Sequence, residues 1–159
     1  MVANIFQFIA TCSSACVLAK YGRKNPTLVG EVALSIINFT IGALFLANII
    51  TGNTGCLYAA AVFIIFFMIA YSLSLGPVVW PLVPEILPIQ YIPYASCTNW
   101  VAAAICTIAT PYILNAVGSP YPVFFFFGGI SIIFFIINWN ILIETKGLTP
   151  SQIAAKLSK

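Results

Sequence analysis

Apolar side chains dominate five long stretches of the chain, and short polar segments separate them. Each stretch can cross the roughly 30 Å of hydrocarbon in a bilayer as a helix that rises about 1.5 Å per residue. The stretches run over Val2–Ala19, Thr27–Ile50, Cys56–Trp80, Tyr94–Val117 and Pro122–Ile143. Because the connections are short, consecutive helices should be antiparallel neighbours. The pattern predicts an all-α membrane protein in which residues 1–148 form a single bundle of about five transmembrane helices.

The third stretch carries an unusual run of prolines. Pro77, Pro81, Pro84 and Pro88 all fall within Gly76–Pro88, and each removes a backbone donor from a helix. A bilayer tolerates such a run only where other protein or water satisfies the freed carbonyl groups. We therefore expect the third helix to be broken by its prolines. The break indicates either a binding site at a discontinuous helix or a plain kink that ends the helix near the membrane interface.

Residues 149–159 predict a different element. Thr149, Pro150 and Gln152 have the form of a capping box, with threonine at the N-cap, proline at the first helical position and glutamine three residues after the cap. Ile153 and Leu157 follow with helical spacing and share one face. We predict a short amphipathic C-terminal helix that lies along the membrane surface or against the bundle.

Composition supports an integral membrane protein and limits its chemistry. Of the 159 residues, 62% are hydrophobic and only 6% are charged, and the mean hydropathy is +1.08, whereas soluble proteins have roughly a quarter of their residues charged. Histidine and aspartate are absent, which removes the usual general base, the usual proton relay and two common metal ligands. We expect no enzyme activity, no metal or other cofactor and no nucleic-acid partner, with lipids around the bundle.

The distribution of charge predicts the orientation in the membrane. Lys20, Arg23 and Lys24 follow the first predicted helix, and the other three lysines, at 146, 156 and 159, follow the fifth. In a five-helix chain these two places lie on the same side, and the loops on the opposite side carry no charge. By the positive-inside rule the N-terminus is outside and the C-terminus is on the cytoplasmic or equivalent side. The organelle stays open, and the mitochondrial inner membrane is one candidate.

Four motifs in order resemble the C-terminal half of a sugar porter of the major facilitator superfamily. Gly22-Arg23-Lys24 is similar to the loop between the eighth and ninth helices of that family. Gly76–Trp80 followed by Pro84–Pro88 resembles its tenth helix and the acidic motif after it, Asn99-Trp100 resembles the eleventh, and Glu144–Thr149 resembles the segment after the twelfth. The resemblance covers nearly the whole chain and corresponds to helices eight to twelve.

The resemblance implies roles for six residues. Trp80 would stack on a sugar and Asn99 would bond a sugar hydroxyl, with Trp100 beside it as a third candidate. Arg23, Glu85 and Glu144 would remain from a charge latch that gates the cycle. Four positions of the family pattern have lost their charged or amide residues and are here Ala19, Ser72, Ile92 and Ala103, and Ile143 stands where the family has a proline. The motifs are therefore degenerate, and the latch and sugar site have lost several partners.

Two functions follow from the resemblance. The family needs twelve helices in two halves, and the first half and the seventh helix are missing here. Our main hypothesis is a truncated, transport-incompetent half that serves as an accessory subunit of a multi-subunit membrane assembly, of respiratory or ATP-synthase type. The alternative is the C-terminal half of a working hexose-type transporter that needs a separate N-terminal half. A stoichiometric partner with the first seven helices would favour the alternative.

Overall fold

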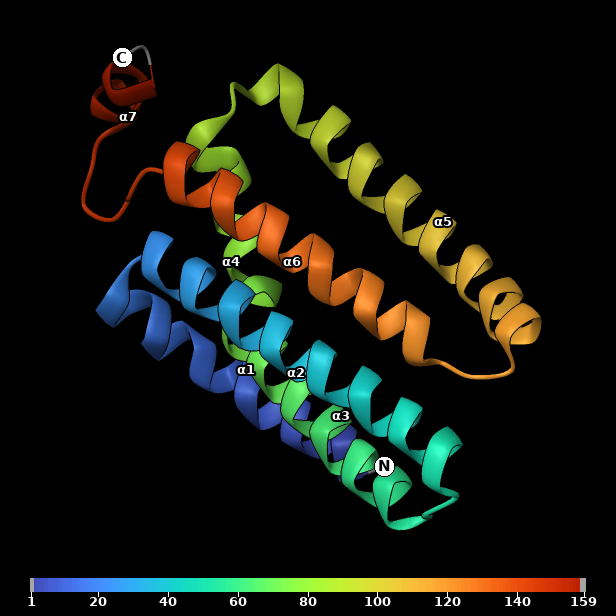
Figure 1. Ribbon diagram of the computed structural model, residues 1–159. Coiled ribbons are helices and arrows are strands. Elements are labelled where there is room, and N and C mark those ends of the chain that lie inside the picture. Colours follow the sequence, from blue (N-terminus) through green and yellow to red (C-terminus); the bar gives the residue numbers. More distant parts are fainter. Residues whose placement is uncertain (1, 158–159) are drawn as a thin grey trace.

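The computed structural model describes residues 2–157, which form helices joined by short turns (Figure 1). The helices are α1 (Val2–Tyr21), α2 (Lys24–Thr51), α3 (Gly55–Leu73), α4 (Leu75–Ile86), α5 (Ile92–Val117), α6 (Tyr121–Ile141) and α7 (Pro150–Leu157), with a 3-10 turn η1 (Ile89–Tyr91) before α5. α3 and α4 follow one another with a single residue between them. The predicted all-α bundle is confirmed.

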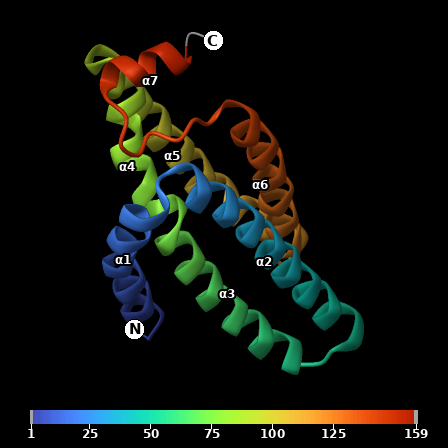
Figure 2. The same cartoon turned by 90° about the vertical axis from the view of Figure 1, so that its left-hand side faces the viewer.

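Four segments are long and apolar enough to cross a membrane, namely Lys24–Thr51, Gly55–Ile86, Ile89–Val117 and Tyr121–Ile141. α1 adds a shorter apolar helix, which together with these four accounts for the predicted five. Apart from the third segment, the helix ends lie within three residues of the predicted ones. The bundle has the N-terminus at one end and the C-terminus at the other (Figures 1 and 2).

The third segment breaks earlier than the sequence predicted. The expected break is confirmed, but it lies at Ser74, three residues before Pro77, rather than at the predicted helix end, Trp80. The backbone angles of Ser74 are φ −119° and ψ −93°. α4 then continues past Pro81 and Pro84 to Ile86. Glu85 therefore lies on a helix rather than between the predicted third and fourth helices. Pro81 and Pro84 each remove one backbone hydrogen bond from α4, but the helix continues through both.

A close contact with α2 accompanies the break. Ser74 is buried, and both its N–H and its hydroxyl donate to the carbonyl oxygen of Ala70, at 3.1 and 2.6 Å. On α2, a Cβ added to Gly30 would overlap the side chain of Ser74. The missing side chain at Gly30 thus allows α2 to approach the break, as small residues do between membrane helices.

α2 and α6 interlock through two reciprocal glycine contacts. The ring of Phe125 on α6 lies 3.1 Å from where a Cβ of Gly42 would stand, and the ring of Phe39 on α2 lies 3.1 Å from the same position on Gly128. The two rings also contact each other, with centroids 6.0 Å apart. Ser35 adds a hydrogen bond of 3.0 Å to the carbonyl oxygen of Gly128. Each bulky ring therefore fills the space above a glycine on the facing helix.

α5 is the least covered long helix. It contacts α4, η1 and α6, and it stands apart from the α1–α2–α3 group in Figure 1. None of its residues is buried. A groove of about 460 Å³ separates its C-terminal half from α6, with lining residues that include Ile105, Ala109 and Phe126. α5 thus presents apolar surface that nothing within the described residues covers.

The predicted C-terminal helix forms as α7. The side-chain oxygen of Gln152 accepts a hydrogen bond of 2.9 Å from the backbone N–H of Thr149, which is one half of a capping box. Ile153 is buried, and α7 contacts α4. The helix therefore packs against the bundle, one of the two predicted arrangements. The side chain of Leu157 lies outside the described residues.

We predict that Gly30→Ala destabilises the bundle, because the new methyl group would overlap Ser74, which is fixed by its own hydrogen bonds. Overpacking of this kind costs about 1–3 kcal/mol. The measurement is detergent-induced unfolding followed by circular dichroism. Gly129→Ala is the matched control, since a Cβ there has nothing within 4 Å. Equal loss of stability in both variants would contradict the packing argument.

Candidate functional site

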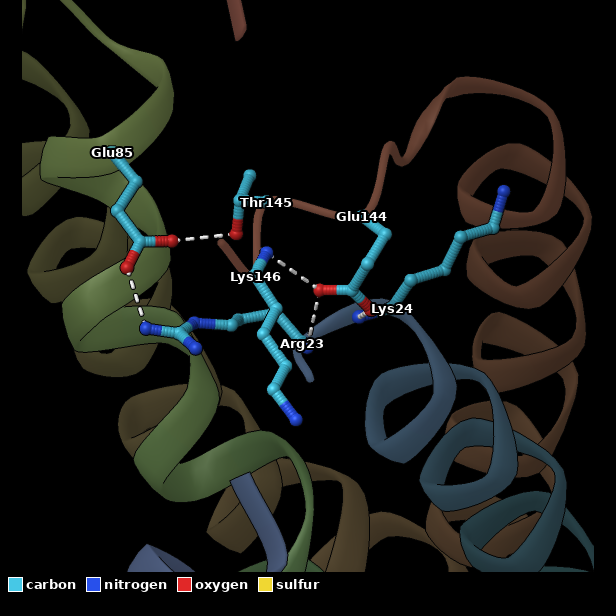
Figure 3. Close-up of polar contacts among 6 residues, drawn as sticks. All are labelled: Arg23, Lys24, Glu85, Glu144, Thr145 and Lys146. Carbon is cyan, nitrogen blue, oxygen red and sulfur yellow. Dashed lines mark hydrogen bonds and ion pairs between the residues drawn. The ribbon is translucent and has the colours of Figure 1, made fainter. Parts of the chain in front are cut away.

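An ion pair joins α2 to α4 at the end of the bundle where the chain's basic residues gather. Arg23 precedes α2, and its Nη2 lies 2.7 Å from Oε1 of Glu85 on α4 (Figure 3). The hydroxyl of Thr145, in the segment after α6, donates to the other oxygen of Glu85 at 2.6 Å. Both carboxylate oxygens of Glu85 are therefore engaged, and three separate parts of the chain meet there.

Glu144 binds the start of α2. Its carboxylate accepts hydrogen bonds from the backbone N–H groups of Arg23, at 2.9 Å, and of Lys24, at 3.1 Å (Figure 3). The first N–H groups of a helix have no partner within the helix, and a negative charge is favourable there. The side chain of Arg23, the N-cap residue itself, makes no such bond. Glu144, more than a hundred residues away in the sequence, thus caps α2.

Gly22 makes this approach feasible. Its φ of +81° is left-handed, a conformation that residues with a Cβ adopt at a cost. A Cβ at Gly22 would also overlap the carboxylate of Glu144. Position 22 therefore requires glycine for two reasons: the backbone is left-handed there, and a side chain would collide with Glu144.

The hydrogen bonds set the protonation of Glu144. Burial on its own would raise the pKa of this carboxyl, but backbone N–H groups of Arg23, Lys146, Lys24 and Thr145 interact with the charged form and hold its pKa below the usual 4.5. Glu144 is therefore ionised at neutral pH. The same end includes two lysines that donate to carbonyl groups, Lys146 to Lys20 at 3.0 Å and Lys24 to Trp139 at 3.4 Å.

We call the contacts of Arg23, Glu85, Glu144 and Thr145 the latch. The sequence predicted that the first three belong together, and the structure brings them together. Thr145 was missed, because a threonine in a loop carries no signal of its partner. The buried Nε of Arg23 has no hydrogen-bond partner among residues 2–157.

A cleft between α4 and α5 contains two of the predicted sugar-site residues. Trp80 lies on α4 and Asn99 on α5, and both line a cavity of about 220 Å³ together with Ser96. Within residues 2–157 the amide of Asn99 makes no side-chain hydrogen bond, so it is free to bind a ligand. Trp100 does not line this cleft and is 65% exposed. A tryptophan, an asparagine and a serine thus line one cavity.

Comparison with known proteins identifies the family. A family model described as "Sugar (and other) transporter" matches residues 1–157. The chain belongs to this sugar transporter family. It is 30% identical to a facilitated trehalose transporter of Drosophila willistoni, over 99% of this chain and 19% of that protein. It is also 30% identical to Hexose transporter 1 of Plasmodium vivax, over 92% of this chain and 29% of that protein. The chain thus spans about a fifth to a third of the length of these relatives.

Solved structures of a sugar porter have the same fold as this chain. A double-tryptophan mutant of XylE matches 98% of the chain with a TM-score of 0.85 and 22% identity, and the chain covers 34% of that structure. The resemblance to part of a major facilitator sugar porter is therefore confirmed, and the chain is an integral membrane protein. The roles of the latch and the cleft, the orientation of the termini and the organelle stay predictions.

We predict that Glu144→Gln lowers the free energy of unfolding at neutral pH by about 0.5–2 kcal/mol, as loss of a helix cap does. It should also remove part of the acid sensitivity. A carboxyl whose pKa is lower in the folded state stabilises it fully above the unfolded pKa, near 4.5, and this contribution is lost as the pH falls through the folded value. Stability measured against pH checks both effects. An unchanged acid limb in the variant would contradict the assignment.

Proposed function

We propose that this chain supplies part of the C-terminal half of a sugar carrier and that the cleft between α4 and α5 forms one wall of its sugar site. The observation that carries the proposal is the convergence of Trp80 and the free amide of Asn99 on one cavity. An aromatic ring offers a flat apolar face for a sugar ring, and an amide both donates and accepts hydrogen bonds with hydroxyl groups. Family membership supports the same function.

The rest of the site comes from other helices. Small-molecule sites usually enclose about 300–1,000 Å³, whereas this cleft measures about 220 Å³ and has walls from α4 and α5 alone. The exposed apolar face of α5 also needs a helix to cover it. We propose that helices of the other half, in the same polypeptide or a separate one, close the cleft, and that one of them packs into the groove between α5 and α6.

The latch gates the cleft through α4 in this proposal. Glu85 follows Trp80 on the same helix by five residues, or about 7.5 Å along its axis. Breaking the bonds from Arg23 and Thr145 to Glu85 releases the end of α4, and the wall that carries Trp80 moves with it. By the positive-inside rule we place the latch on the cytoplasmic or equivalent side. Sugar is then released on that side when the latch opens.

A hexose-sized neutral sugar is the proposed substrate class. The relatives carry the names of trehalose and hexose transporters, and transporters are not enzymes, which supports the prediction of no enzyme activity. The accessory-subunit hypothesis, with a respiratory or ATP-synthase assembly as partner, gains no support from these relatives. The alternative, a working half of a sugar transporter, therefore becomes our proposal. For Trp100 we propose contact with the other half rather than with the cleft, because its ring is exposed on α5.

We predict that Trp80→Ala weakens hexose binding about two- to tenfold, since loss of an aromatic contact costs about 0.5–1.5 kcal/mol. Asn99→Ala should cost a similar factor through the lost hydrogen bond. The measurement is counterflow uptake of labelled hexose into vesicles that hold the chain with its co-purifying membrane partners.

Trp139→Ala is the matched control, because this tryptophan is equally exposed, at 61% against 59% for Trp80, but lies on α6. Uptake should be unchanged in this variant. Hexose uptake that survives both cleft substitutions would refute the proposed site.

A further inference from the structure

A buried carboxyl group on α2 takes no part in the latch or the cleft. Glu31 is 3% exposed and lies where α2 packs against α6. The side-chain amide of Asn138 on α6 donates to its Oε1. Its Oε2 is buried and has no hydrogen-bond partner within residues 2–157. One carboxylate oxygen is therefore satisfied and the other is not.

No charged or titratable group near Glu31, within the described part of the chain, forms an ion pair that would stabilise a negative charge on its carboxylate. Arg23 is paired with Glu85, and the amino group of Lys24 donates to Trp139. α1, α3, α4 and α6 are the helices that contact α2. Their charged or titratable side chains are Cys12, Cys16, Lys20, Tyr21, Cys56, Tyr58, Tyr71, Glu85 and Tyr121. Across the described part of the chain, none of these forms a hydrogen bond or ion pair with Glu31.

Comparison with the other two glutamates shows what is unusual. Glu85 has a guanidinium and a hydroxyl as partners, and Glu144 has backbone N–H groups. Glu31 has one neutral amide. An ionised group buried without a charged partner is costly, and such a group tends to become neutral instead. A proton on Oε2 would remove the charge and leave the bond from Asn138 in place.

We propose that Glu31 is a proton-binding site within the contact between α2 and α6. The proton comes from water and binds Oε2, while Oε1 continues to accept the hydrogen bond from Asn138. A cavity of about 260 Å³ between the two helices is lined by Glu31 and Ser35 among apolar residues, and it leaves room for water beside the carboxyl group. The inference rests on these contacts and does not depend on sugar transport.

The composition of the chain makes the site testable. With no aspartate or histidine and only three glutamates, few groups can produce the infrared carbonyl band of a protonated carboxylic acid. The experiment records this band at neutral pH for the chain with its co-purifying partners, in a detergent that has no carbonyl groups. Subtracting the spectrum of Glu31→Gln cancels every carboxyl contributed by partners.

The expected result is a carboxylic acid band in the wild type that Glu31→Gln removes. Ser35→Ala is the matched control, because it deletes another polar contact between α2 and α6 that cannot titrate, and it should retain the band. If Glu31→Gln does not fold, Asn138→Leu tests the same point. Loss of the amide donor should then shift the band to higher frequency.

A wild-type spectrum without the band, or a band unchanged in Glu31→Gln, would overturn the proposal. An unshifted band in Asn138→Leu would do the same. None of these readouts involves sugar, so failure of the proton site and failure of the proposed carrier function are separate results.

Discussion

Close approach between α2 and α6 is the contact on which the rest of the bundle depends. α2 touches α1, α3, α4 and α6, so an error in its position would move every other helix of the core. Lipid offers no hydrophobic gain for bringing two apolar helices together, and packing and hydrogen bonds must supply the stability. The glycines at 42 and 128 admit the rings of Phe125 and Phe39. The bonds from Ser35 to Gly128 and from Asn138 to Glu31 then fix the register.

The latch extends this contact to the end of the bundle. Glu144 follows α6 and caps α2, so the same two helices are joined again beyond the membrane span. Thr145, the next residue, reaches Glu85 on α4. Because adjacent residues of one segment bind two different helices, a shift of α4 that keeps these bonds intact would strain the start of α2. This coupling is a physical reason for the acidic residue and threonine to be neighbours.

The helices and part of the latch could be predicted from the sequence. Long apolar runs predict transmembrane helices because lipid leaves few alternatives, and the charged motifs correctly grouped Arg23, Glu85 and Glu144. The break at Ser74 lies three residues before Pro77, where a proline disrupts a continuous helix, but the contact of Ser74 with Gly30 was not predictable because the two lie on different helices. The pairing of Glu31 with Asn138 was missed for the same reason. Such contacts join residues far apart in the chain, and no local pattern marks them.

Unsatisfied polar groups give the strongest physical reason to expect a ligand or a partner helix beside α5. Thr107 and Thr110 on this helix donate to carbonyl groups one turn earlier, at 2.8 and 2.7 Å, so they are stable in apolar surroundings. Asn99 has no such bond. An amide without a partner in hydrocarbon costs several kcal/mol. In the membrane, Asn99 must therefore face water, a sugar hydroxyl or a polar group of another helix, and each of these requires that the cleft between α4 and α5 is not filled by lipid.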